Sequence, residues 1–82
     1  MILKIDRIPR DAVFYFMRLK INGEIADGVK AATVRELLDE LKIEPGRVAV
    51  EVNLMIVKKA DYSGFALRDG DIVEIVNFVG GG

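Results

Sequence analysis

Residues 69–82 read DGDIVEIVNFVGGG, and this run decides how the rest of the chain is interpreted. Asp69-Gly70-Asp71 is a tight-turn signal, because aspartate and glycine tolerate the backbone angles that turns require. The apolar residues that follow predict a strand over residues 72–79. Three glycines come next, and glycine offers no side chain for packing and has maximal backbone freedom. We therefore expect residues 80–82 to form a flexible tail whose one chemical group is the carboxylate of Gly82.

The stretch from residue 17 to residue 29 predicts an antiparallel hairpin. Apolar residues alternate with Arg18 and Lys20, which is the pattern of a half-buried strand over residues 17–21. Asn22-Gly23 is a strong hairpin signal, because a type I′ turn needs positive φ at both central positions. Residues 24–29 then form the returning strand.

A short helix follows. Thr33-Val34-Arg35-Glu36 matches a capping box, in which the Thr33 side chain accepts a backbone hydrogen bond and Glu36 reaches back. Apolar residues then recur on one helix face, namely Val34, Leu37, Leu38 and Leu41. Pro45-Gly46 is expected to end the segment. Because a helix of about two turns is not stable alone in water, we expect it to lie on the sheet.

The second half of the chain predicts three more strands. Valines alternate with other residues over residues 48–53, Ile56-Val57 form a short fourth strand, and residues 72–79 form the last one. Tyr62 and Phe65 are expected to plug the edge of the core. The order strand, strand, helix, strand, strand, strand predicts an α+β fold, the ubiquitin-like β-grasp. Its mixed sheet of four to five strands packs on one main helix.

Residues 1–16 fit this plan least well. Pro9 and nearby charges interrupt a strand-like start, and Phe14-Tyr15-Phe16 hold half of the aromatic residues. These residues either add a strand, fold over an exposed sheet, or come from a start codon assigned too early, since Met17 begins a self-sufficient domain. The predicted division is an N-terminal extension at 1–16, a β-grasp domain at 17–79 and a glycine tail at 80–82.

Composition excludes several classes of function. The 82 residues fit one domain, and the chain has no Cys and no His, which removes thiol nucleophiles, disulfides, the usual zinc sites and imidazole chemistry. Twelve basic and thirteen acidic residues give a net charge of −1, which argues against binding nucleic acid. No apolar run approaches the ~20 residues that span a bilayer. We expect a cytoplasmic monomer with no metal, no bound cofactor and no membrane contact.

The turn Asp69-Gly70-Asp71, the strand residues Val73-Glu74-Ile75-Val76 and the ending Phe78-Val79-Gly80-Gly81-Gly82 resemble the ThiS family, the sulfur carrier proteins of thiamin biosynthesis. The likeness covers Met17 to Gly82. Two departures lie away from the tail: Asn53-Leu54-Met55 stands where the family often has Asn-Gly-Glu, and Lys58-Lys59 stands where it often has a proline.

The resemblance implies a cycle of chemistry at Gly82. An E1-like adenylating enzyme (ThiF-like) uses ATP to adenylate the Gly82 carboxylate. A sulfur donor such as a cysteine desulfurase then converts it to a thiocarboxylate, and a thiazole synthase (ThiG-like) accepts the sulfur. Gly80 and Gly81 let the tail enter a narrow channel, because they carry no Cβ. The chain itself is then a carrier and not an enzyme, in agreement with its lack of His and Cys.

Strand parity predicts a docking face. Val73 and Ile75 share one face of the last strand, which we expect to cover the helix. Val76 and Phe78 then lie on the open face, just before the tail, together with Ala49 and Glu51. We expect Val76 and Phe78 to anchor the partner enzymes. The alternative is that strand twist or the N-terminal extension makes them part of the core.

Three other functions are compatible with the pattern. The small subunit of molybdopterin synthase shares the fold and the diglycine thiocarboxylate, although it usually has a proline near Phe78-Val79-Gly80. A ubiquitin-like modifier shares the activation chemistry. A TGS-like binding module shares the pattern of residues 67–75 but needs no glycine terminus.

Overall fold

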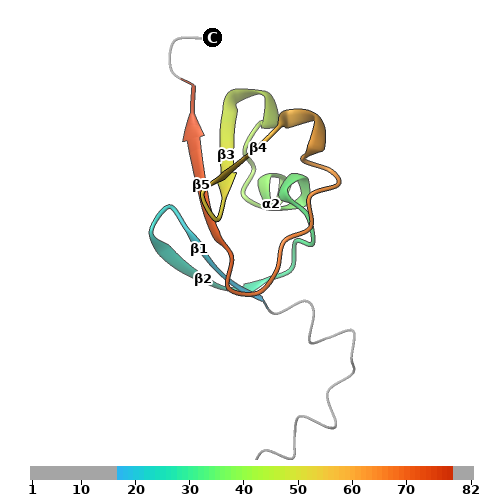
Figure 1. Ribbon diagram of the computed structural model, residues 1–82. Helices are drawn as coiled ribbons and strands as arrows, with labels where there is room; N and C mark the ends of the chain where they lie inside the picture. The colour runs from blue at the N-terminus through green and yellow to red at the C-terminus, as the bar shows by residue number, and fades with distance from the viewer. Residues whose placement is uncertain (1–16, 79–82) are drawn as a thin grey trace, which may run out of the picture.

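The computed structural model describes residues 17–78, which form a five-stranded sheet with one α-helix on one of its faces (Figure 1). The strands are β1 (Met17–Ile21), β2 (Glu24–Val29), β3 (Val48–Val52), β4 (Met55–Val57) and β5 (Ile72–Asn77). Their order in the sheet is β2-β1-β5-β3-β4; β1 pairs with β5 in parallel, and the other neighbours are antiparallel. The mixed sheet and helix confirm the predicted α+β, β-grasp fold. The extension at residues 1–16 and the tail lie outside the described residues.

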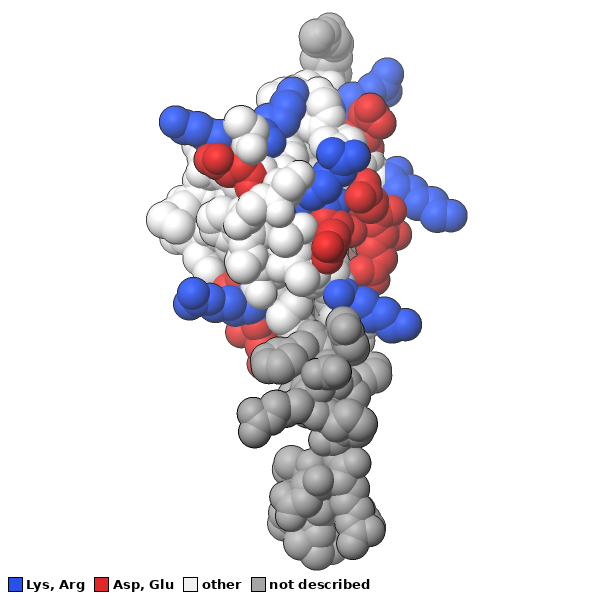
Figure 2. Space-filling model, turned by 90° about the vertical axis from the view of Figure 1, so that its right-hand side faces the viewer, with Lys and Arg blue, Asp and Glu red and all other residues white. Residues whose placement is uncertain are grey.

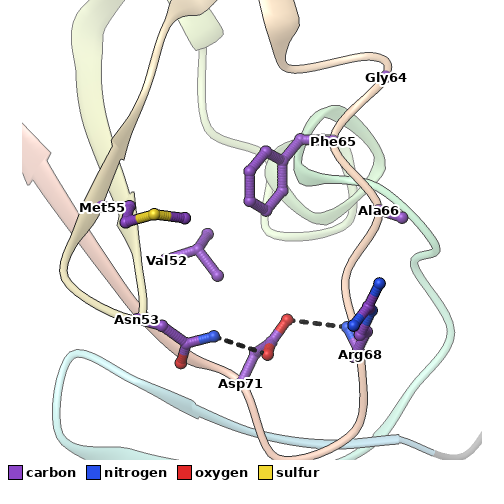
Figure 3. Close-up of a pocket in the computed structure, with 8 residues that line it drawn as sticks. All are labelled: Val52, Asn53, Met55, Gly64, Phe65, Ala66, Arg68 and Asp71. Carbon is purple, nitrogen blue, oxygen red and sulfur yellow. Dashed lines mark hydrogen bonds between the residues drawn. The ribbon is translucent and has the colours of Figure 1, made fainter.

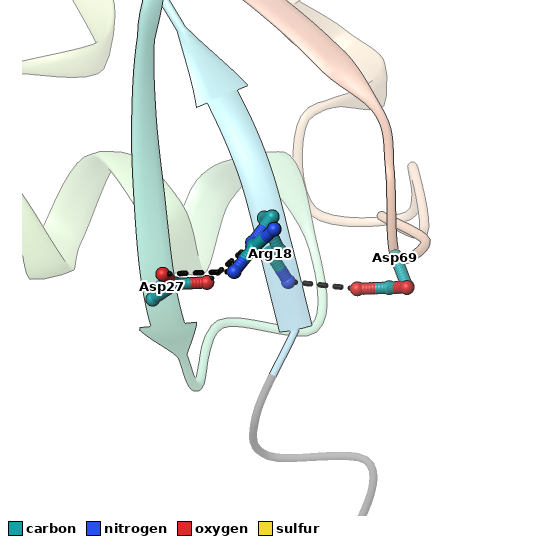
Figure 4. Close-up of polar contacts among 3 residues, drawn as sticks. All are labelled: Arg18, Asp27 and Asp69. Carbon is teal, nitrogen blue, oxygen red and sulfur yellow. Dashed lines mark hydrogen bonds and ion pairs between the residues drawn. The ribbon is translucent and has the colours of Figure 1, made fainter.

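The β1–β2 hairpin has the predicted turn. Asn22 and Gly23 have φ values of 49° and 86°, which are the two positive angles of a type I′ turn. Arg18 links the two strands of this hairpin to each other and to the turn before β5 (Figure 4). Its Nε donates to Asp27 Oδ1 on β2 at 2.6 Å, and its backbone N–H donates to Asp69 Oδ1 at 2.8 Å. The hydrogen bond and charge of Asp27 raise the pKa of Arg18, but both side chains are exposed, so the pair adds little stability.

Helix α2 (Val34–Glu40) begins with a modified capping box. Thr33 Oγ1 accepts a hydrogen bond from the Glu36 backbone N–H at 3.2 Å, as predicted. The Glu36 carboxylate does not return to the N–H of Thr33; it accepts from the Ala32 N–H at 2.8 Å. The first bond satisfies an N–H in the first turn, which has no partner within the helix. The second satisfies an N–H just before the helix.

The end of α2 differs from the prediction. The sequence assigns the stop to Pro45-Gly46, but the helix ends earlier, in a Schellman motif. Lys42 adopts a φ of 60°, and the Ile43 N–H donates to the Leu38 C=O at 2.8 Å. This left-handed position is usually occupied by glycine. Because lysine occupies it here, the sequence contains no local signal for the end of the helix. Pro45-Gly46 instead opens the 3-10 turn η2 (Pro45–Arg47).

The core lies between α2 and the sheet. Its most fully buried side chains are Leu19, Val34, Leu37, Leu38, Val48, Val50, Val52 and Val73. These residues are the inward positions of the predicted alternation and helix face. Leu41 is the exception: the helix pattern predicts it on the buried face, but it caps the helix end and its side chain is 41% exposed.

Tyr62 closes the edge of the core beside β4, as predicted, and Phe65 packs against the same core. Tyr62 follows the 3-10 turn η3 (Lys59–Asp61) and is 3% exposed. Its hydroxyl donates to the Val48 C=O at 3.1 Å. Because β4 ends at Val57, opposite Val50, the hydroxyl satisfies a β3 carbonyl beyond the end of the β4 ladder. Burial raises the pKa of Tyr62.

Two asparagine side chains add hydrogen bonds to β5 beyond its backbone ladders with β3 and β1. Asn22 accepts from the Ile75 N–H at 2.7 Å and donates to the Ile75 C=O at 3.2 Å, which extends the β1–β5 ladder by one pair. Asn53 accepts from the Ile72 N–H at 2.9 Å and donates to Asp71 Oδ1 at 2.9 Å (Figure 3). Asp71 also accepts from the Arg68 N–H at 2.8 Å. The start and middle of β5 are therefore bonded to side chains from two hairpin turns as well as to the neighbouring strands.

The β3–β4 turn is a second two-residue hairpin that the sequence does not predict. Asn53 and Leu54 have φ values of 53° and 71°, close to those of Asn22 and Gly23. Leucine is costly in this left-handed region, where its Cβ crowds the backbone. The Leu54 side chain is 86% exposed, so packing does not offset the cost.

Leu54→Gly is expected to raise the free energy of unfolding by about 0.5–1 kcal/mol, because glycine removes the left-handed strain at the cost of some unfolded-state entropy. Gly23→Leu is the matched reverse change, because an added Cβ at Gly23 meets no atom within 4 Å and only backbone strain is introduced. It should destabilise the protein by a similar amount. Urea unfolding measures both; a destabilised Leu54→Gly variant would contradict the interpretation.

Tyr62→Phe is expected to lower the free energy of unfolding by about 1–2 kcal/mol, because it leaves the buried Val48 C=O without a donor. The raised pKa means that the folded state holds the hydroxyl proton more tightly than the unfolded state, whose tyrosine titrates at about 10. This stabilisation is therefore complete below about pH 10 and is lost as the pH rises through the folded-state pKa.

The measurement is urea unfolding of wild type and variant near neutral pH and above about pH 10. The stability difference between the two proteins should shrink at high pH. Since lysine titration is common to both, an unchanged difference would count against the assigned role of the hydroxyl.

Candidate functional site

Strand β5 lies at the centre of the sheet and runs toward the glycine tail (Figure 1). Of the residues that the sequence assigns to the site, Val76 and Phe78 are described, whereas Gly80, Gly81 and Gly82 lie outside the described residues. The strand itself ends at Asn77, two residues before the predicted end at Val79. The ladder nevertheless continues, because the Phe78 N–H donates to the Arg47 C=O at 2.8 Å.

The β3–β5 register places the site residues on one face. Val76 lies opposite Ala49, and Glu74 lies opposite Glu51. Phe78 continues this alternation beside Arg47. On the other face Val73 is fully buried and Ile75 packs against the core. The predicted parity of β5 is therefore confirmed, and we call the side away from α2 the open face.

The open face carries exposed apolar side chains. Val76 is 59% exposed and Phe78 is 55% exposed, so neither belongs to the core that residues 17–78 form. Ile72 on β5 shares their parity, and Ile56 on β4 lies opposite Glu51; both are also exposed. Exposed apolar groups gathered on one face are typical of a surface that binds another molecule.

Two of these residues escape the sequence analysis for different reasons. Ile72 has the parity of Val76 and could have been assigned to the open face from alternation alone. Ile56 could not, because its neighbour on the face depends on the β3–β4 register.

Several acidic residues elsewhere in the described part of the chain have structural partners. Asp39 pairs with Arg35 at 3.2 Å, and Asp69 caps the start of β1. The hollow beside the β3–β4 turn contains one carboxylate, that of Asp71, and its oxygens accept from Asn53 and Arg68 (Figure 3). Within residues 17–78 no group of three or more Asp and Glu side chains is placed to hold a metal ion. What residues 17–78 offer at this end of β5 is therefore a surface with exposed apolar side chains.

Charges are mixed on the face drawn in Figure 2, where basic and acidic side chains of the described residues are interspersed. A protein that binds nucleic acid through its phosphates gathers its basic residues on one side. No helix within residues 17–78 is long and apolar enough to cross a membrane.

The sequence model of the ThiS family matches residues 19–82. A protein named sulfur carrier protein ThiS, from Bacillus subtilis, is 40% identical over 65 residues, which are 78% of this chain and 98% of that protein. The crystal structure of a thiamine biosynthesis protein (ThiS) from Geobacter metallireducens superposes with a TM-score of 0.68 at 36% identity. That match covers 80% of this chain and 100% of the solved one.

A longer relative is also similar. A thiazole synthase from Paramagnetospirillum magneticum is 50% identical over 66 residues, which are 80% of this chain. The matched segment is 20% of that protein, so the chain spans about a fifth of the length of this relative.

Proposed function

The chain belongs to the ThiS family, and from this premise we propose that it is a sulfur carrier for the thiazole of thiamin, with the Gly82 carboxylate as the reacting group. The observation that carries the proposal is the match over residues 19–82, which includes the glycine tail. The near full-length similarity to the B. subtilis sulfur carrier supports the same role.

The chemistry requires activation of a group that does not otherwise react. A carboxylate is resonance-stabilised and resists nucleophiles. Adenylation by ATP releases pyrophosphate and makes AMP the leaving group, so that a sulfur nucleophile displaces AMP and forms a carbon–sulfur bond at Gly82. With a persulfide donor the first product is an acyl disulfide; a second thiol cleaves its S–S bond, which frees the thiocarboxylate and leaves the two thiols joined as a disulfide. The thiocarboxylate stays covalently attached until it reaches its acceptor. Catalytic groups and ATP come from the partner enzymes, and the carrier binds no cofactor of its own.

The geometry suits a carrier. Asn22 and Asn53 hold β5, while the four residues that follow Phe78 include three glycines. Fully extended, four residues reach at most ~14 Å. A partner that processes Gly82 must therefore contact the carrier close to Phe78, which favours Val76 and Phe78 as its anchors.

The partners follow from this chemistry. We assign an adenylating enzyme (ThiF-like), a sulfur donor such as a cysteine desulfurase, and a thiazole synthase (ThiG-like), all meeting a monomeric carrier in the cytoplasm. The synthase has additional support, because a protein named thiazole synthase contains a segment that is 50% identical to this chain.

Intact mass spectrometry of the protein from its native host tests the carrier role. The expected result is a species heavier by the replacement of one oxygen by sulfur, and deletion of Gly82 should abolish it. An unmodified carboxylate after incubation with the activating enzyme, ATP and a sulfur donor would contradict the proposal.

Phe78→Asp tests the docking face. It is expected to lower the rates of adenylation and sulfur transfer by about tenfold or more, because it replaces an apolar anchor with a charge. Stability should change by less than about 0.5 kcal/mol, since Phe78 is 55% exposed. Leu54→Asp is the control, because Leu54 is also exposed but lies at the far end of β3. Unchanged rates for Phe78→Asp would show that the anchor lies elsewhere.

A further inference from the structure

Two glutamates face one another in the middle of the open face. Glu51 on β3 and Glu74 on β5 are direct partners in the antiparallel register. The Cβ atoms of such partners lie about 4.5–5.5 Å apart, and like charges in this position repel. Ile56 is the neighbour of Glu51 on β4, and Ala49 and Val76 form the adjacent pair.

The burial of these residues is the reverse of the usual order. Glu51 and Glu74 are partly buried, whereas Val76 is 59% exposed and Ile56 is 76% exposed. Charged groups ordinarily take the more exposed positions on a surface. Partial burial also strengthens the repulsion, because less water lies between the carboxylates.

Within residues 17–78 neither glutamate forms an ion pair, although Lys20 on β1, the register partner of Ile72, shares the open face. The two ion pairs in this range are Arg18 with Asp27 and Arg35 with Asp39. Neither glutamate side chain accepts a hydrogen bond from another residue between 17 and 78, although those of Glu36, Asp69 and Asp71 do. Within residues 17–78 the open face thus holds two adjacent carboxylates, flanked by Ile56 and Val76, with Lys20 on the same face.

We propose that Glu51 and Glu74 together receive one arginine side chain of the thiazole synthase, while Val76 and Ile56 pack against apolar groups around it. This inference rests on the proposed function. A guanidinium is planar and carries several donors, so a single one bridges two neighbouring carboxylates better than an ammonium does. The surrounding apolar contacts exclude water and strengthen the charge interaction.

The synthase is the occupant for two reasons. The open face is continuous with the end of β5, so a molecule seated on it lies within reach of Gly82. The relative from P. magneticum joins a segment similar to this chain to the rest of a thiazole synthase. The glutamate pair then makes binding selective, since a partner without a basic group at this point would leave both carboxylates desolvated and unpaired.

The test compares Glu51→Gln and Glu74→Gln with the control Glu44→Gln in the full chain. Glu44 is exposed and its side chain caps nothing, so the control makes the same charge change away from the open face. Each open-face variant should raise the melting temperature of the free carrier, because repulsion is relieved. Each should also weaken binding to the purified synthase by about tenfold at low salt. The control should change neither quantity.

Glu51→Lys provides a second discrimination. It should stabilise the free carrier further, by pairing with Glu74, and should remove binding to the synthase. Loss of stability in the Gln variants, or unchanged synthase binding, would overturn the inference while leaving the carrier function intact. Weaker binding to the activating enzyme alone would overturn the choice of the synthase.

The chain's own basic extension is the remaining occupant to exclude. If replacing Lys4, Arg7 and Arg10 with glutamine removed the stability gain of the Gln variants, the glutamates would already be paired within the chain, and the inference would be wrong. If wild type acquired no sulfur and bound no synthase, the proposed function and this inference would fall together.

Discussion

Backbone ladders to β3 and β1 position β5, and two asparagine side chains add hydrogen bonds to it. Asn22 and Asn53 each occupy the first central position of a two-residue hairpin turn, with φ values of 49° and 53°. This left-handed conformation leaves the side-chain amide free to pair with the backbone of β5, at Ile75 from one side and at Ile72 from the other. The same residue type therefore makes each turn and also fixes the central strand to it. Without these bonds the parallel β1–β5 ladder has only the pairs Lys20–Ile72 and Ile21–Val73 in register.

A fixed β5 decides which side chains the domain presents on its open face. Register decides which side chains face α2 and which face outward, and a slip of one residue would exchange them. With β5 held, Val73 enters the core and Val76 stays outside. The described part of the chain then ends at Phe78, beside Val76 on the open face, which is the face that the proposed partners would contact.

The fold was largely predictable because its signals are local. Asn22-Gly23 encodes its turn, Thr33 and Glu36 encode the helix start, and alternating valines encode β3. The two missed turns share a physical cause: a residue that rarely adopts positive φ occupies a left-handed position where glycine is usual. Lys42 ends the helix without glycine, and Leu54 completes a turn without glycine. At the open face, parity placed Glu51 and Val76 on one side, but the juxtaposition of Glu51 and Glu74 depends on the long-range register of β3 and β5.

Several features of the open face reduce the stability of the isolated domain. Val76, Phe78 and Ile56 expose apolar surface, and the β3–β5 register sets Glu51 opposite Glu74, where like charges are unfavourable. A domain of this size has a small free energy of unfolding, because its core is small. Exposed apolar groups and unpaired charges are commonly found where a surface is complementary to another molecule. In the complex the apolar groups are buried and the charges are paired. These features agree with the proposal that the open face binds another protein. On that proposal, contacts that are few and partly electrostatic allow the carrier to be released after each transfer.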